Sequence, residues 1–129
     1  MEKTDKILVI GALGEAGHKI TQSLRLKYGR TQVIATGPLQ RGRVRSEYFP
    51  YTRLDALNKA KLLMLVRDES ITQIYLLPAT LSAQGDPNQQ TEWQHDMDRL
   101  SNVLDISVKC NVEKIYWPCC SANSRILDS

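Results

Sequence analysis

The stretch that decides the fold is Lys6-Ile7-Leu8-Val9-Ile10-Gly11-Ala12-Leu13-Gly14-Glu15-Ala16-Gly17, near the start of the chain. Its first half, Lys6–Ile10, is typical of a strand buried on both faces. Apolar residues at helical spacing follow, and Gly29 is a typical helix stop. A second apolar run over Gln32–Thr36 completes a β-α-β unit of about 31 residues, a length that suits a crossover between parallel strands.

The rest of the chain continues to alternate between strands and helices. Strands are expected over Tyr48–Leu54, Ile71–Leu77 and Glu113–Trp117, and helices over Ala56–Asp68 and Gln90–Cys110. This alternation predicts an α/β fold, a Rossmann-like doubly wound parallel sheet of about five strands in the order 3-2-1-4-5. A ligand crevice is expected between strands 1 and 4. Cys119–Ser129 shows no convincing element, so we expect the sheet to be truncated before a sixth strand. The fifth strand is then an exposed edge through which a homodimer can form.

Composition limits the classes of protein to which the chain can belong. Its 129 residues favour a single domain, 1–129, and 17 Lys and Arg against 14 Asp and Glu give a net charge of +3. This small excess argues against nucleic acid or membrane as a partner, and no apolar run reaches the roughly 18 residues of a membrane span. The three cysteines follow neither a metal-binding nor a disulfide pattern, and the start has no signal peptide. We therefore expect a cytoplasmic protein without a metal site.

The glycine turn between the first strand and the first helix favours dinucleotide binding. Gly11 permits a tight turn, Gly14 lets the backbone approach a pyrophosphate, and Gly17 lets the helix pack closely against the strands. The helix N-terminus then offers free N–H groups to the phosphates. The spacing is Gly-x-x-Gly-x-x-Gly. A purely structural turn, kept after binding was lost, is the alternative interpretation.

Three stretches resemble the extended short-chain dehydrogenases (the NAD-dependent epimerase/dehydratase family), most closely the short-chain type of L-threonine 3-dehydrogenase. They are Ile7–Gly14, Ile71–Tyr75 with Leu81–Ala83, and Val112–Pro118. The resemblance covers only the N-terminal half of that fold. It implies NAD as cofactor, oxidation of the 3-hydroxyl of threonine, and assembly into dimers or larger oligomers. It also implies cofactor contacts at Gly11, Leu13, Gly14, Gly17, Gly37, Asp55, Leu77, Pro78 and Ala79, and a substrate contact at Ser82.

The sequence departs from this family at the cofactor's adenosine end. The family has an acid at the end of the second strand, which holds the ribose hydroxyls, and Gly37 stands there instead. Arg41, Arg43 and Arg45 offer two interpretations: a site for the 2′-phosphate of NADP, or a solvated basic loop. Asp55 also has two interpretations, a contact to the adenine amino group or an N-cap of the following helix.

Larger departures affect catalysis. Asp96 stands where the family has an Asn of the proton relay, and Cys120 stands at the position of the catalytic Ser or Thr. No Tyr-x-x-x-Lys, the family's general base and its partner, follows Cys120. We therefore expect a dinucleotide-binding domain that is catalytically inactive as this chain. Two alternatives stay open: the N-terminal part of an active NAD-dependent threonine dehydrogenase or epimerase, and a non-catalytic binding or subunit-interaction module.

Overall fold

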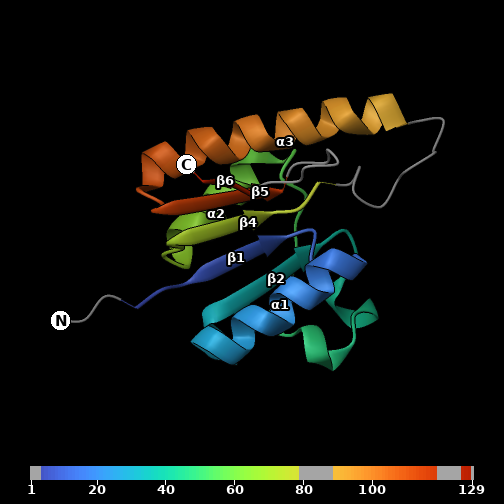
Figure 1. The fold of residues 1–129 in the computed structure, drawn as a ribbon, viewed down its shortest axis with the longest axis vertical. Helices are drawn as coiled ribbons and strands as arrows, with labels where there is room; N and C mark the ends of the chain where they lie inside the picture. Colours follow the sequence, from blue (N-terminus) through green and yellow to red (C-terminus); the bar gives the residue numbers. More distant parts are fainter. Residues whose placement is uncertain (1–3, 79–88, 119–125, 129) are drawn as a thin grey trace.

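The chain folds around one sheet, shown in Figure 1, with strand order β3-β2-β1-β4-β5-β6. The computed structural model describes residues 4–78, 89–118 and 126–128, with side chains for 4–78 and 93–118. The strands are β1 (Ile7–Ile10), β2 (Val33–Gly37), β3 (Tyr51–Arg53), β4 (Gln73–Leu76), β5 (Lys114–Pro118) and β6 (Ile126–Asp128). The helices are α1 (Glu15–Tyr28), α2 (Lys59–Asp68) and α3 (Gln89–Cys110).

The first five strands are parallel, and their order is the predicted 3-2-1-4-5. Ile7 of β1 lies opposite Val33 on one side and Gln73 on the other, so β1 occupies the centre of the sheet. The chain reverses its winding direction at β1, since β2 and β3 lie to one side and β4 and β5 to the other. The Rossmann-like prediction is therefore confirmed.

The end of the sheet differs from the prediction. We expected no strand after Cys119, but β6 pairs antiparallel with β5, with Trp117 opposite Leu127. The strand has only three residues, too few for an apolar pattern to be recognised in sequence. In the described part of the chain, β5 is therefore an interior strand, and the prediction that β5 forms an exposed edge is wrong. Self-association of the chain stays a prediction.

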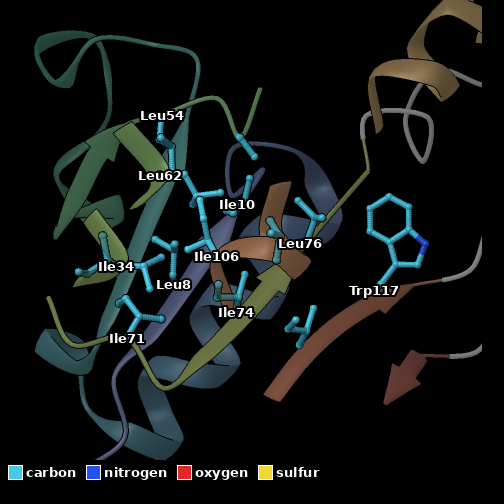
Figure 2. Close-up of a cluster of buried hydrophobic side chains, with 14 residues drawn as sticks. Leu8, Ile10, Ile34, Leu54, Leu62, Ile71, Ile74, Leu76, Ile106 and Trp117 are labelled. Carbon is cyan, nitrogen blue, oxygen red and sulfur yellow. The ribbon is translucent and has the colours of Figure 1, made fainter. Parts of the chain in front are cut away.

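Successive residues of β1 supply two separate cores. Leu8 and Ile10 face α2 and α3, where they join a cluster that includes Leu62 of α2 and Ile106 of α3 (Figure 2). Ile7 and Val9 point to the opposite face and pack with Leu24 of α1. All four β1 residues are buried. This burial on both faces explains why β1 is a continuous apolar run and lacks the alternation of a half-exposed strand.

Two arginine side chains donate hydrogen bonds to the backbone of the segment between β2 and β3. The guanidinium of Arg25 on α1 donates hydrogen bonds to four backbone carbonyls, those of Val33, Glu47, Tyr48 and Pro50. Arg30 donates to the carbonyls of Ser46 and Phe49. Five of these six carbonyls, those of residues 46–50, lie in the irregular segment between β2 and β3, so the bonds give that segment a defined path beside α1.

Candidate functional site

A cleft of about 830 Å³ opens at the carboxyl ends of β1, β2 and β4, where the strand order predicts a ligand site. Its lining residues are Ile10, Gly11, Leu13, Gly14, Glu15, Ala16, Gly17, Lys19, Gly37, Pro38, Leu54, Asp55, Leu77, Pro78, Asp96 and Arg99. Eight of the nine predicted cofactor contacts are among them. The ninth, Ala79, lies outside the described residues, as do Ser82 and Cys120.

Gly11 and Gly17 close the turn at the base of the cleft, and neither leaves room for a side chain. Gly11 has a φ of +88°, a conformation that favours glycine, and a Cβ there would lie 2.9 Å from the Leu77 carbonyl oxygen. A Cβ on Gly17 would overlap the carbonyl oxygen of Gly11 and lie 2.8 Å from Cα of Ala12. Helix α1 therefore rests directly on the backbone of the turn.

Gly14 has a different role, because it faces open space. It is the N-cap residue of α1, and the nearest atom to a Cβ placed on it is the Gly11 carbonyl oxygen at 4.0 Å. Its own side chain cannot cap the helix, and no side chain of the described residues does so. The N–H groups of the first turn therefore point at the cleft with the positive end of the helix dipole, an arrangement that suits an anion.

Gly37, at the predicted position of the ribose-binding acid, is buried by its neighbours. A Cβ on it would lie 2.9 Å from Cγ of Leu13 and 3.1 Å from the hydroxyl of Tyr51. That hydroxyl donates a hydrogen bond of 2.7 Å to the Leu39 carbonyl. The space an acidic side chain needs is thus filled by Leu13.

The three basic residues after β2 lie away from the cleft, because none of them contributes to its lining. Arg41 stacks over the ring of Phe49 at 5.2 Å. Arg45 forms an exposed ion pair with Glu47 at 3.6 Å. These contacts favour the solvated-loop interpretation over a phosphate site.

At the other end of the cleft, Arg99 of α3 bridges two carboxylates. Its Nε and one terminal nitrogen bind the two oxygens of Asp55 at 2.8 and 3.2 Å, and its other terminal nitrogen binds Asp96 at 3.1 Å. The Asp96 side chain is 1% exposed, that of Arg99 17% and that of Asp55 47%. Hydrogen bonding to Arg99 lowers the pKa of Asp55, and the same contact raises the pKa of Arg99. Asp55 and Arg99 are therefore both charged at neutral pH.

The interpretation of Asp55 as a helix cap is wrong. Helix α2 begins at Lys59, and Asn58 is its N-cap, accepting a hydrogen bond from the Lys61 N–H. Asp55 accepts instead from the N–H of Leu57, two residues on, in addition to Arg99. Its carboxylate is thereby held at the rim of the cleft.

Sequence reasoning missed Arg99, along with Glu15, Ala16, Lys19, Pro38 and Leu54 of the cleft lining. The available signal was the spacing of Asp96 and Arg99, one helical turn apart on the face of α3 that carries Val103 and Ile106. A carboxylate and a guanidinium on a core-facing stripe indicate an internal ion pair. The third member, Asp55, is 44 residues away in sequence and is brought near only by the fold.

The cleft has three parts: the positive N-terminal end of α1, an apolar middle, and a rim that carries charged side chains. Among the described residues, no group of three His, Cys, Asp or Glu side chains is arranged to hold a metal ion. In the same part of the chain, no helix has the length and apolar character needed to cross a membrane. The arrangement suits an elongated ligand with an anionic centre and a hydrogen-bonding ring.

Comparison with known proteins finds relatives that are named as epimerase/dehydratases and as L-threonine dehydrogenases. An uncharacterized epimerase/dehydratase of Staphylococcus aureus is 30% identical over 115 residues, covering 83% of this chain and 34% of that protein. A GalE-like L-threonine dehydrogenase from Cupriavidus necator, in its holo form, superposes with a TM-score of 0.76 at 35% identity, over 87% of this chain and 36% of that one. The L-threonine dehydrogenase of Clostridium difficile gives 0.76 at 28% identity, over 90% and 36%. The chain thus spans about a third of the length of these relatives. No protein-family model matches it.

Proposed function

We propose that this chain, which matches the N-terminal part of the extended short-chain dehydrogenase and epimerase/dehydratase family, binds a nicotinamide dinucleotide in the cleft beside β1 and β4. The observation that carries the proposal is the glycine turn. Gly11 and Gly17 are sterically required where they stand, whereas Gly14 faces empty space at an uncapped helix N-terminus. A purely structural turn has no steric need of glycine at the middle one of the three positions.

Each part of the ligand has matching residues. The turn from Gly11 to Gly17 and the first N–H groups of α1 would hold the pyrophosphate. Leu13 and Leu77 would cover the apolar middle, beside Pro78. Asp55, ionised and half-exposed at the rim, would accept a hydrogen bond from the adenine amino group. When bound, the nicotinamide ring supplies hydride acceptance, and these residues only bind and orient it.

NAD is the proposed form, bound with modest affinity. Without an acid at position 37 the ribose hydroxyls lose a charged acceptor, which weakens binding by about 1.5–3 kcal/mol, or roughly 10- to 100-fold. None of the three arginines after β2 lines the cleft, so none of them is positioned to bind the 2′-phosphate of NADP.

Catalysis is a separate question from binding. The 129 residues contain no Tyr-x-x-x-Lys, and the buried Asp96 pairs with Arg99, which disfavours a relay role for it. We therefore propose that these residues bind the dinucleotide without transferring hydride by themselves. The similarity to enzymes named L-threonine dehydrogenases supports a second proposal, that the unit serves chemistry of that kind when other residues supply the base.

Calorimetric titration of the folded protein with NAD, and separately with NADP, tests the proposal. We expect saturable NAD binding and weaker binding of NADP. Gly14→Ala is the informative variant, since its methyl group enters the space in front of the helix end, and it is expected to abolish or strongly reduce the heat. If folded protein shows neither heat of binding nor a thermal shift with either nucleotide, the proposal is wrong and the glycine turn has only a structural role.

A further inference from the structure

The wall of the cleft beside the end of β2 carries no side chain that can accept a hydrogen bond. Its lining residues there are Leu13, Gly37 and Pro38, and none of them has a polar side-chain atom. Leu13 lies directly on Gly37, since a Cβ at residue 37 would be 2.9 Å from both Cγ and Cδ1 of Leu13. In a fold of this type, the end of the second strand faces the ribose of a bound dinucleotide. The sugar would therefore meet the leucine side chain.

Polar groups around this wall are already engaged within the protein. The carbonyl of Thr36 accepts a hydrogen bond from the N–H of Ala12 at 2.9 Å, and the carbonyl of Gly37 accepts one from the N–H of Leu54 at 3.0 Å. The hydroxyl of Tyr51, close to Gly37, donates to a backbone carbonyl at 2.7 Å and belongs to a residue that is 2% exposed and does not line the cleft. A sugar hydroxyl placed against this wall therefore loses hydrogen bonds to water and gains no acceptor side chain in return.

We propose that Leu13 and Gly37 determine the sugar specificity of the cleft by making it indifferent to the 2′-hydroxyl, so that it binds nucleoside diphosphates of ribose and of 2-deoxyribose alike. The methylene group of a 2-deoxyribose buries apolar surface against Leu13 and leaves no polar group without a partner. A ribose at the same place gains less from that contact, so the advantage that a carboxylate gives to ribose is absent. The inference rests on the proposed function and adds to it the class of sugar that the cleft accepts.

Adenosine 5′-diphosphate and 2′-deoxyadenosine 5′-diphosphate are the probes, because they share the base and the phosphates and differ only at C2′ of the sugar. Calorimetric titration of the wild-type protein should give dissociation constants for the two compounds that agree to within about 3-fold. A carboxylate at the end of β2 would instead favour the ribose compound roughly 10-fold, which is the effect of a hydrogen bond to a charged group.

Gly37→Asp combined with Leu13→Ala is the test variant, because it supplies a carboxylate together with the room that the carboxylate needs. It should favour the ribose compound roughly 10-fold. Leu13→Ala alone is the matched control, since it removes the same apolar atoms without adding an acceptor. It should weaken the binding of both diphosphates equally and keep the ratio of their dissociation constants within about 3-fold of unity. If the double variant does not fold, Leu13→Asp carries the test, because its carboxyl carbon takes the place of Cγ of Leu13 beside residue 37.

Three results would count against the inference. Wild-type protein that binds NAD and prefers the ribose compound by more than about 3-fold would overturn the inference and leave the proposed function standing. A folded carboxylate variant that still binds both diphosphates to within about 3-fold would also overturn it, because residue 37 would then not face the sugar. Failure of folded wild-type protein to bind NAD or either diphosphate would remove the proposed function, and this inference with it.

Discussion

Replacing Gly17 by alanine tests whether α1 must rest directly on the glycine turn. The added methyl carbon would overlap the Gly11 carbonyl oxygen and would lie 2.8 and 2.9 Å from two backbone atoms of Ala12. All three are backbone atoms of a tight turn, so none can move aside as the end of a flexible side chain does. The helix must instead shift outward, which loosens the packing of Leu24 on β1 and β2.

The expected loss follows from two opposing contributions. Overpacking of a well-packed contact costs about 3 kcal/mol when backbone must move. Alanine has a higher helix propensity than glycine, which adds about 1 kcal/mol to the free energy of unfolding. The net loss is about 2 kcal/mol of the free energy of unfolding, which corresponds to a fall in Tm of roughly 6–12 °C for a domain of this size.

Urea denaturation followed by circular dichroism measures this loss, and a nucleotide titration of the same variant shows whether the turn still binds. Gly42→Ala is the control, because no atom lies within 4 Å of a Cβ at that exposed position. It should leave both stability and binding unchanged. A Gly17→Ala variant as stable as the Gly42→Ala variant would refute the packing argument, and undiminished nucleotide affinity would refute the link between α1 and the site.

Three further predictions concern the cleft and the segment beside it. Gly37→Asp should lower the free energy of unfolding by about 1–3 kcal/mol, because its side chain clashes with Leu13. Adding Leu13→Ala should relieve the clash and raise the affinity for NAD roughly 10-fold. A double variant that shows no gain in affinity by calorimetry would contradict this prediction. Arg25→Ala should lower the free energy of unfolding, measured by urea denaturation, by about 2–4 kcal/mol, because four carbonyls lose a charged donor. A loss below about 1 kcal/mol would show that water replaces the guanidinium without penalty. Hydrogen bonding to Arg99 lowers the pKa of Asp55, so the contribution of Asp55 to stability is complete above about pH 4 and disappears as the pH falls through its folded-state pKa. The difference in the free energy of unfolding between wild type and Asp55→Asn, measured by urea denaturation, should therefore shrink from pH 7 to pH 3, by less than about 1 kcal/mol because the group is half-exposed. A difference that stays constant over this range would argue against the pair.

Periodicity and glycine spacing were enough to predict the parallel part of the fold. The first five strands and three helices are local patterns, and the rules of right-handed crossover leave few ways to join them. The structure places α2 three residues later than predicted, at Lys59, because Asn58 caps it in place of Asp55. Both residues are good N-caps, so propensity alone could not choose between them.

The rim of the cleft, where Asp55, Asp96 and Arg99 meet, was harder to predict from the sequence. Asp55 and Asp96 were identified through a family resemblance, but the residue that joins them was not. Arg99 is one of 17 basic residues, and only the packing of α3 beside the end of β3 distinguishes it. In the same way, nothing local shows that Leu13 fills the space beside Gly37. Such juxtapositions depend on tertiary structure, which periodicity does not encode.

Because β1 lies between β2 and β4, its two edges are completed by segments at unequal distances along the chain. Ile7 pairs with Val33, 26 residues away, and with Gln73, 66 residues away. Closing the longer loop costs about 0.8 kcal/mol more in chain entropy, so pairing with β2 is favoured as the earlier event. The cleft needs β4, since Leu77 and Pro78 form one of its walls. The proposed nucleotide would therefore have little to bind in the early half-sheet, and it would stabilise the chain by binding only after the last strands have paired.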